Sequence, residues 1–355
     1  MTLPLSWLLH APNVHVGGGL VLLKQLLKSI VETEGVLKGA TLDIRVHSEL
    51  EPLVPYTCEV MWVKPRLIHR IQSERWLAQQ TKPDNIVFCF HSMPPMWPLA
   101  GRVIVFFQNR NDLNVLPLST FTGKTRLRTA YERWICRTFK RTVDEYWVHT
   151  ASMARLLTTW HGENPNIRII PLMNRIPSPG ILPAELSSNQ WDYIYPADGI
   201  EHKNHYKLIE AWGEMTKAGC FPTLLLTLSP HFTELHTLIG SVKLLGARIQ
   251  NIGPQPYATI LALYSRCRSL IFPSFSECFG LPLLEAKEMN LDILAPELDY
   301  VRDVCEPAHT FDPMSATSIA RAVQRHQQQP PSHITSVVYP ESFIQTLLMN
   351  KERVS

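Results

Sequence analysis

Two carboxylates and a glycine turn lie within one short stretch, where together they could bind a ligand that carries both hydroxyl groups and an anion. The stretch reads FPSFSECFGLPLLEAKE over residues 272–288, with Glu277 before Gly280 and Glu285 after it. A carboxylate accepts hydrogen bonds from hydroxyls such as those of a sugar or a ribose. A single acid near a helix start commonly does no more than complement the helix dipole, so the combination is what favours a ligand site.

The elements around these residues are predicted to be a strand, a loop and a helix. Residues 270–272 close an apolar run typical of a buried strand, and residues 273–279 then form a loop. Gly280 permits a tight turn and Pro282 suits the first helical position, so a helix is expected over residues 281–289. The free N–H groups at the start of that helix form a site for an anion such as a phosphate.

The spacing of the two glutamates, with Phe279-Gly280-Leu281-Pro282 between them, resembles the E-x7-E signature of the retaining group-4 glycosyltransferases of the GT-B fold. The resemblance implies a nucleotide diphosphate sugar as donor, no further cofactor, no metal ion, and retention at the anomeric carbon. It also implies that Glu277 holds the donor sugar and that Glu285 binds the ribose. The implied donor-binding residues are Gly17, Gly18, Gly19, Lys203, Glu277, Cys278, Phe279, Gly280, Leu281 and Glu285.

Short apolar strands alternate with helical segments along the chain, a pattern that predicts parallel sheets covered by helices on both faces. Strands are expected at residues 6–10, 42–46, 60–63, 86–91, 103–108, 146–149 and 167–171, and, after a proline-rich break, at 192–195, 223–228, 248–252, 269–272 and 291–294. With the resemblance, this implies an α/β GT-B chain whose two Rossmann-like domains face a central cleft. The expected parts are an acceptor-side domain at residues 1–175, a nucleotide-sugar domain at residues 176–335, and a helix at residues 336–355 that returns to the first domain.

A run of three glycines follows the first predicted strand and precedes an amphipathic helix. Gly17, Gly18 and Gly19 thus have the strand–loop–helix arrangement that binds phosphates in nucleotide folds, or they form a tight turn that needs glycine torsions. The run is not G-x-G-x-x-G, which disfavours a dinucleotide cofactor. The family carries a similar Gly-rich first loop that lies against the donor diphosphate and the acceptor.

Polar residues follow two of the predicted strands, and ligands gather at the carboxyl ends of strands in such sheets. In many group-4 enzymes the strand that corresponds to residues 103–107 ends in a histidine near the reacting sugar, and this chain has Gln108 there. Glutamine forms hydrogen bonds but does not titrate. His91, one strand earlier, is either the residue that compensates or a satisfied core histidine. The catalytic residues implied are Glu277, Lys203, Gln108 and His91.

Lys203 lies where a polar loop enters a helix of the second domain, a position that suits either a surface charge or a phosphate clamp. The family has a lysine here that meets the donor phosphates, together with an arginine six residues earlier. Ala197 occupies the place of that arginine. His202, His205 and Arg175 are the residues that could replace it.

Residues 124–141 carry seven cations against one acid, Glu132, and are predicted to form a helix. The helix either covers the sheet with a solvated basic side, or uses that side to meet anionic lipid headgroups, which would suit a lipid-linked acceptor. Helical spacing places Arg126, Arg133, Arg137, Lys140 and Arg141 on the basic side, and Leu127, Tyr131, Trp134, Ile135 and Phe139 on the packed side.

Composition supports a two-domain protein without a nucleic-acid signature. The chain has 355 residues, 45% hydrophobic content and a formal charge of +3, and its seven cysteines include no C-x-x-C pair, which fits a reducing compartment. The start, MTLPLSWLLHAP, has no basic n-region, and no apolar run approaches the ~20 residues of a membrane span. We expect a soluble cytoplasmic protein, peripheral on the inner face of the plasma membrane if the basic helix binds lipid.

We therefore expect a retaining, metal-independent glycosyltransferase that moves a sugar from a nucleotide diphosphate sugar to a glycan or lipid-linked acceptor, in bacterial surface polysaccharide or lipopolysaccharide synthesis. Two alternatives stay open. Ala197 and Gln108 suit a catalytically silent subunit that binds a nucleotide sugar. Paired βαβ domains also suit a nucleotide-cofactor oxidoreductase.

Overall fold

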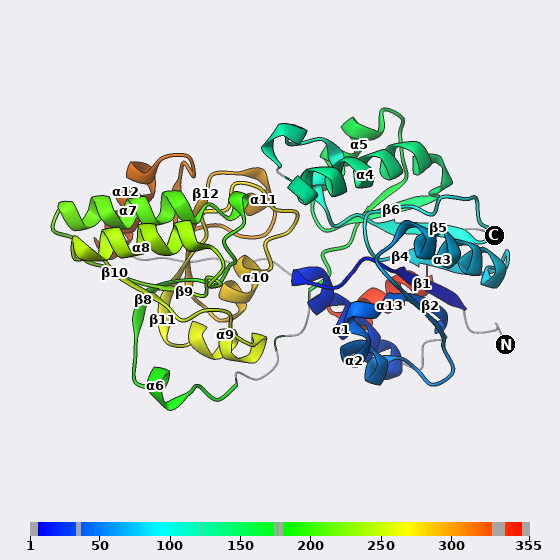
Figure 1. Cartoon of the computed structure of the whole chain (residues 1–355), viewed down its shortest axis with the longest axis horizontal. Coiled ribbons are helices and arrows are strands. Elements are labelled where there is room, and N and C mark those ends of the chain that lie inside the picture. The colour runs from blue at the N-terminus through cyan, green and yellow to red at the C-terminus, as the bar shows by residue number, and fades with distance from the viewer. Residues whose placement is uncertain are drawn as a thin grey trace. The chain divides into compact units, whose positions relative to one another are not determined.

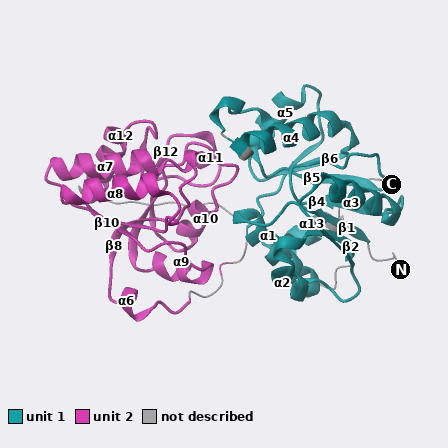
Figure 2. Ribbon diagram, viewed as in Figure 1, with its two compact units in different colours: residues 1–175, 337–355 teal, residues 176–336 magenta. Residues whose placement is uncertain are grey.

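The computed structural model describes residues 6–32, 37–121, 123–173, 176, 180–328 and 338–349. The chain divides into two compact units, Met1–Arg175 with Val337–Ser355 (unit 1), and Ile176–Ser336 (unit 2), shown in Figure 2. Each unit contains its own parallel sheet with helices on both faces (Figure 1). The prediction of an α/β chain with two Rossmann-like domains is confirmed.

In the described part of unit 1, seven parallel strands form one sheet in the order β3-β2-β1-β4-β5-β6-β7. β1 pairs with β2 on one side and with β4 on the other, so the strand order reverses beside β1 and creates a switch point where ligands commonly bind. The strands are β1 Trp7–Ala11, β2 Leu37–Asp43, β3 Glu59–Val63, β4 Ile86–Cys89, β5 Arg102–Phe106, β6 Glu145–Val148 and β7 Ile167–Ile169.

Helices cover both faces of this sheet, with α4 and α5 on one side and α1 and α13 on the other (Figure 1). Phe343 of α13 packs against Phe88, Phe106 and Trp147, with ring centroids 5.6, 5.5 and 5.1 Å away. The last described helix therefore completes the core of unit 1. The helices are α1 Gly17–Glu32, α2 His47–Leu50, α3 Leu67–Gln80, α4 Gly123–Phe139, α5 Ala151–His161 and α13 Pro340–Met349.

Unit 2 repeats this design with six parallel strands among its described residues, in the order β10-β9-β8-β11-β12-β13. The order reverses between β8 and β11, and Figure 1 shows α7, α8 and α12 on one side of the sheet and α9 and α10 on the other. The strands are β8 Trp191–Tyr195, β9 Thr223–Leu226, β10 Arg248–Asn251, β11 Cys267–Ile271, β12 Asp292–Pro296 and β13 His309–Phe311. The helices are α6 Ala184–Ser187, α7 His205–Lys217, α8 Thr233–Leu244, α9 Tyr257–Tyr264, α10 Leu281–Glu288, α11 Asp299–Arg302 and α12 Ala316–Gln328.

The second strand lies earlier than the predicted residues 42–46, because β2 ends at Asp43. The Asp43 carboxylate accepts a hydrogen bond from the backbone N–H of Arg45 at 2.9 Å and so starts a short 3-10 helix, Ile44–Val46. Gly39 interrupts the apolar pattern at the beginning of the strand. It is needed there, because a Cβ atom would lie 2.9 Å from the Trp76 ring.

Helix α4 packs in a different orientation from the predicted one. Its buried side chains include Glu132, Ile135 and Cys136, whereas Leu127 is 74% exposed and Trp134 is 56% exposed. The prediction that Leu127 and Trp134 face the sheet is therefore wrong.

Two cations explain this orientation, because they bond to backbone carbonyls of neighbouring segments. Arg133 donates hydrogen bonds to the carbonyl oxygens of Asn111 and Leu116, both at 2.7 Å, and Lys140 donates to that of His161. Carbonyl groups outside regular structure need such donors when they are shielded from water. Arg133 and Lys140 thus do not belong to a solvated basic side, and the Lys124 side chain lies outside the described residues.

Buried histidines should make the stability of the protein sensitive to acid. Burial lowers the pKa of His149 to about 3 and that of His205 to about 4, from an ordinary value of 6.5. At a pH between the lowered pKa of each histidine and its ordinary pKa of 6.5, the unfolded chain binds more protons than the folded chain. The free energy of unfolding should therefore fall as the pH drops below 6.5, by about 1.4 kcal/mol per pH unit for each histidine.

Melting temperatures of the parent protein and a His149→Gln variant, each measured near neutral pH and near pH ~5, test this prediction. The parent should lose more stability in acid than the variant, because glutamine takes up no proton. Equal losses would show that His149 does not cause the acid sensitivity.

No helix in the described ranges is both long enough and apolar enough to cross a bilayer. The seven cysteines all lie among the described residues, and none of them forms a disulfide. Among the residues that the structure describes, no three or more His, Cys, Asp or Glu side chains are grouped so that they could hold a metal ion.

Candidate active site

The turn at Gly280 starts α10 at Leu281, four residues after Glu277. Gly280 has a φ of +77°, a left-handed conformation that side chains rarely adopt, and Pro282 lies in the first turn of the helix. A Cβ atom at Gly280 would also meet Leu283 at 2.9 Å. The free backbone N–H groups of the first turn of α10 therefore lie close to Glu277 in the chain, and the turn residue itself, Gly280, has no side chain to cover them.

Lys203 and Glu277 form an ion pair between two loops of unit 2. Lys203 Nζ donates to Glu277 Oε1 at 2.6 Å, and the two side chains are 22% and 13% exposed. Lys203 Nζ also lies 5.9 Å from the centre of the Phe272 ring. The loops follow β8 and β11, which are the strands between which the sheet order reverses. The pair thus occupies the position where α/β sheets bind ligands.

Hydrogen bonds join the two loops that carry this pair. The carbonyl oxygen of His202 accepts from the Phe275 backbone N–H at 3.0 Å and from the Ser274 hydroxyl at 2.9 Å. Asn204, whose φ is +61°, donates from its side chain to the Pro273 carbonyl at 3.1 Å. These bonds fix the backbone on both sides of the ion pair, so Lys203 and Glu277 are held in position by the fold.

Glu285 lies on the buried side of α10 and is 8% exposed. The Tyr264 hydroxyl donates to Glu285 Oε2 at 3.0 Å, and the Tyr257 side chain is a second hydrogen-bond partner. Burial raises the pKa of Glu285 to about 7, while the two tyrosine hydroxyls oppose the rise by stabilising the carboxylate. Glu285 therefore changes charge near neutral pH.

The two tyrosines and Asn204 were not identified from the sequence. Tyr257 and Tyr264 are the first and last residues of α9, seven positions apart, so they lie on the same side of the helix. That spacing, just before the glutamates in the chain, was the available signal. For Asn204 the signal was an asparagine at a helix start, since asparagine tolerates the left-handed conformation.

Ala197 occupies the place where the family has an arginine, and the structure shows which of the candidate residues could take over its role. His205 is buried with its ring 4.8 Å from that of Tyr195, and burial lowers its pKa to about 4, so it carries no charge near neutral pH. Burial lowers the pKa of His202, and the nearby Glu277 carboxylate opposes this change to a smaller extent. His202 is therefore a neutral hydrogen-bonding group beside the ion pair. Arg175 lies outside the described residues.

In unit 1 the glycine run and Gln108 lie together. The sequence suggested that Gly17, Gly18 and Gly19 form a loop before the first helix. In the structure helix α1 begins at Gly17, whose φ is +68°, so the three glycines form its first turn. A Cβ atom at Gly19 would lie 3.7 Å from Gln108 Oε1. Gln108 Nε2 donates to the Phe90 carbonyl at 2.8 Å, which leaves its oxygen on the side of the glycines as an acceptor.

His91 follows β4 and is half-buried. Burial lowers its pKa to about 4, and Arg70, Arg128 and His15 act in the same direction. The ring is therefore a neutral hydrogen-bonding group in electropositive surroundings. It does not supply a proton at neutral pH.

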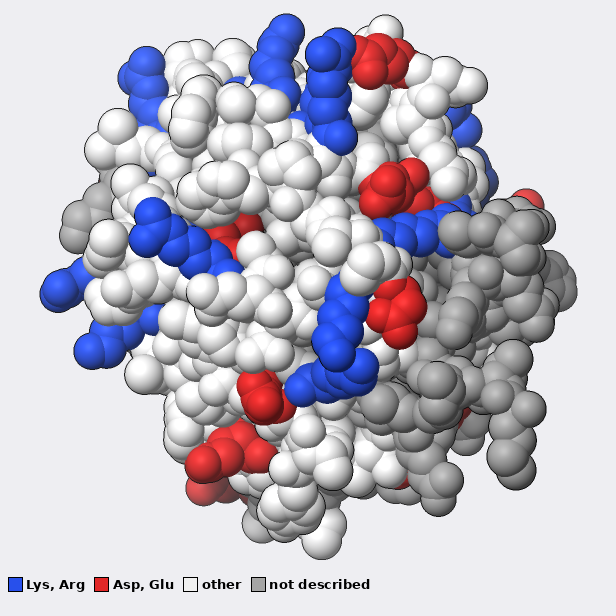
Figure 3. Space-filling view, turned by 90° about the vertical axis from the view of Figure 1, so that its right-hand side faces the viewer, with Lys and Arg blue, Asp and Glu red and all other residues white. Residues whose placement is uncertain are grey.

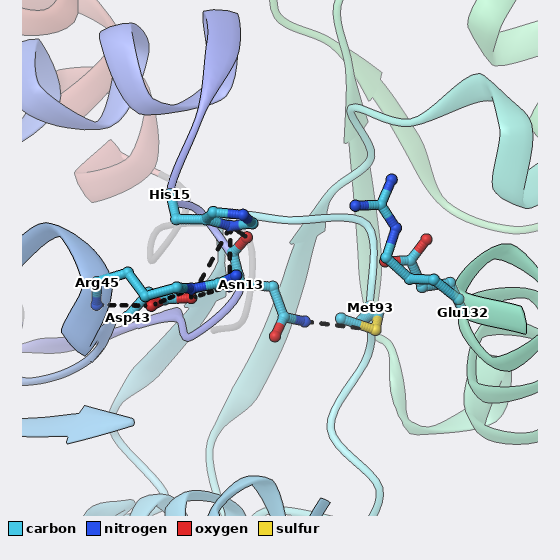
Figure 4. Close-up of polar contacts among 7 residues, drawn as sticks. Asn13, His15, Asp43, Arg45, Met93 and Glu132 are labelled. Atoms are coloured by element: carbon cyan, nitrogen blue, oxygen red, sulfur yellow. Dashed lines mark hydrogen bonds and ion pairs between the residues drawn. The ribbon is translucent and has the colours of Figure 1, made fainter. Parts of the chain in front are cut away.

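A polar cluster lies at the carboxyl ends of β1, β2 and β4 (Figure 4). Asp43 is fully buried and binds Arg45, whose Nε and Nη2 donate to its two oxygens at 2.9 and 2.6 Å. Arg45 Nη2 lies 3.0 Å from His15 Nδ1. Figure 4 shows His15 and Arg45 on one side of Asn13, and Met93 and Glu132 on the other. This edge of unit 1 presents both donors and acceptors, as the binding of a hydroxyl-rich ligand requires.

Residues 183–333 match the family described as Glycosyl transferases group 1. Over 77 residues the chain is 35% identical to the serotype-specific mannosyltransferase WbdA of Escherichia coli, a match that covers 21% of this chain and 9% of WbdA. The chain therefore spans about a tenth of the length of the curated relatives that it matches.

Solved structures share the fold of nearly the whole chain at low sequence identity. Sucrose-phosphate synthase from Thermosynechococcus elongatus has a TM-score of 0.66 at 17% identity, with 99% of this chain and 94% of that one covered. HepE from Anabaena, in complex with UDP and glucose, has a TM-score of 0.63 at 13% identity over 98% and 95% of the chains. The lipopolysaccharide outer core galactosyltransferase WaaB has a TM-score of 0.64 at 10% identity over 97% and 99%. These similarities show the GT-B fold.

Proposed function

We propose, from the premise that residues 183–333 form a domain of the glycosyl transferases group 1 family, that the chain moves a sugar from a nucleotide diphosphate sugar to a glycan or lipid-linked acceptor. The observation that carries the proposal is the Lys203–Glu277 ion pair beside the start of α10, with Glu285 one turn further along that helix. Diphosphate, sugar and ribose would then each meet a group of matching chemistry.

The proposed roles follow from the charge and position of each group. Glu277 accepts hydrogen bonds from the donor sugar, Glu285 accepts them from the ribose, and Lys203 binds the diphosphate. In the ligand-free protein Lys203 is paired with Glu277, so a bound diphosphate would compete for the lysine. Further proposed contacts are the backbone of Cys278, Phe279, Gly280 and Leu281 in unit 2, and Gly17, Gly18, Gly19, Gln108 and His91 in unit 1.

The proposed reaction retains the configuration of the anomeric carbon. The bond between that carbon and the phosphate oxygen breaks, and the nucleoside diphosphate leaves with the electron pair. The acceptor oxygen bonds to the same face of the carbon, and its proton passes to the departing phosphate. Lys203 and the first turn of α10 stabilise the charge that grows on the leaving group, so this mechanism uses no metal ion.

The relatives suggest a biological setting for the acceptor. WbdA is described as a mannosyltransferase and WaaB as a lipopolysaccharide outer core galactosyltransferase. We therefore propose a role in bacterial surface polysaccharide or lipopolysaccharide synthesis, in the cytoplasm, with the protein peripheral on the inner face of the plasma membrane.

A thermal-shift screen of the full chain tests the proposed donor. UDP, GDP, dTDP, CMP, their sugars and NAD are compared, because a ligand that binds only the native state raises the melting temperature. One nucleoside diphosphate and its sugar should stabilise the protein, and NAD should not. Stabilisation by NAD alone would favour the oxidoreductase, and donor binding without any turnover would favour the silent subunit.

A further inference from the structure

The outward side of α4 combines exposed apolar and cationic side chains. Leu127 and Trp134 lie seven residues apart, which is two helical turns, so both point to the same side. Helical spacing places Arg126 and Arg137 on that side too. Arg141 lies in the short 3-10 helix Lys140–Thr142 that follows α4, and all three arginines are exposed. We call these five residues the α4 ridge.

The α4 ridge itself contains no carboxylate. Glu132 is the only acid between residues 124 and 141, and it is buried near Asp112 on the opposite side of the helix. Arg141 pairs with Glu163 of a neighbouring segment at 3.1 Å, and this is an exposed ion pair of the kind that contributes little. Figure 3 shows one face of the molecule, on which Lys and Arg lie scattered among Asp, Glu and uncharged residues.

The Trp134 ring is held in place although it is exposed. Its centroid lies 6.3 Å from that of Tyr131 and 6.1 Å from that of Phe139. A tryptophan with one apolar and one polar edge favours the boundary between water and hydrocarbon. A helix side with tryptophan, leucine and arginines is typical of segments that lie at the surface of a bilayer.

We propose that the α4 ridge docks on an anionic phospholipid surface, with Leu127 and Trp134 in the headgroup region and the three arginines against lipid phosphates. Charge complementarity selects this occupant, because a cationic side without an acid of its own suits an anionic surface. The purpose of docking rests on the proposed function, because docking would bring a glycosyltransferase to a lipid-linked acceptor. Docking itself requires no donor sugar.

Sedimentation of the full chain with vesicles tests this proposal. Vesicles of phosphatidylglycerol with phosphatidylcholine are compared with vesicles of phosphatidylcholine alone, at low and high salt. The test variant is Leu127→Glu with Trp134→Glu. The matched control is Leu244→Glu with Leu245→Glu, because these residues of unit 2 are also exposed and the change in charge is the same.

The parent and the control variant should bind phosphatidylglycerol vesicles equally, and the test variant at least about tenfold more weakly. A second variant, Arg126→Gln with Arg137→Gln, should weaken binding at low salt and less at high salt, because salt screens only the arginine contribution. Melting temperatures show whether each variant is folded. If the double-glutamate test variant does not fold, the glutamine variant decides.

Three results would overturn the proposal: no sedimentation of the parent, equal losses in the test and control variants, or a dimer that the test variant abolishes while vesicles bind nothing. These results are separable from the proposed function. If the parent protein does not bind vesicles but turns over a nucleotide sugar, the docking proposal is wrong and the proposed function stands. If it binds vesicles but has no turnover, the proposed function is wrong and the docking proposal stands.

Discussion

Replacement of Lys203 by alanine should lower the turnover of the nucleotide sugar by about a hundredfold or more. The loss of one group that stabilises charge in a transition state typically costs 10²- to 10³-fold in rate. In this protein the lysine also donates to Glu277 Oε1 at 2.6 Å, so its removal takes away a group that positions the carboxylate that we propose to bind the sugar. The melting temperature should change little, because a partly exposed lysine contributes little to folding.

Lys207→Ala is the matched control for this experiment. Lys207 lies in the first turn of α7, four residues after Lys203, and pairs with Glu210 at 2.7 Å on the surface. Its removal takes away the same charge without touching the proposed site, so turnover should stay within about twofold of the parent, as for an ordinary surface change. If the Lys203→Ala variant has a much lower melting temperature but normal activity per folded molecule, the role of Lys203 is structural.

Replacement of Glu285 by glutamine should weaken the binding of the bare nucleoside diphosphate at least about tenfold above neutral pH. Glutamine keeps the size of the side chain but removes the charge, and a hydrogen bond to a charged group contributes roughly 1.5–3 kcal/mol. Titration calorimetry of the folded variant measures the change. Unchanged affinity would exclude the ribose role for Glu285.

The pH dependence separates this role from a general loss of structure. Because the pKa of Glu285 is raised to about 7, the parent holds mostly the carboxylate above pH 7 and mostly the neutral acid below it. Affinity in the parent should therefore rise with pH through this range more steeply than in Glu285→Gln, while titration of the phosphate affects both equally. Parallel pH profiles would contradict the proposed charge of the bound form.

The features that could be predicted from the sequence are those that depend on neighbours in the chain. The turn at Gly280 needs a left-handed residue, Pro282 suits a first helical turn, and α10 ends within one residue of the prediction. Most strands are continuous apolar runs and lie within a few residues of their predicted places. There are two exceptions. β2 lies earlier than predicted, because Gly39 is set by a contact with Trp76 that lies far along the chain, and β13, the short edge strand His309–Phe311, was not predicted.

Contacts between distant residues account for what could not be predicted. The orientation of α4 depends on carbonyl oxygens of Asn111 and Leu116, which bind Arg133, and no helical periodicity reveals such partners. The surroundings of Glu285 depend on Tyr264, 21 residues earlier, and this contact changes the acidity of the carboxyl group. The spacing of the two glutamates indicates a ligand site, whereas the charge that Glu285 carries at neutral pH follows only from its burial.

Sugar transfer is tested most directly by NMR of the full chain with the donor that the thermal-shift screen identifies, and with simple glycosides and water as acceptors. The release of nucleoside diphosphate and the anomeric configuration of the new product are followed together. We predict that one nucleoside diphosphate is released for each glycoside or free sugar formed, that the product keeps the configuration of the donor, and that Lys203→Ala abolishes most of the release. No release from a donor that demonstrably binds would contradict glycosyl transfer, and an inverted product would contradict the retaining mechanism.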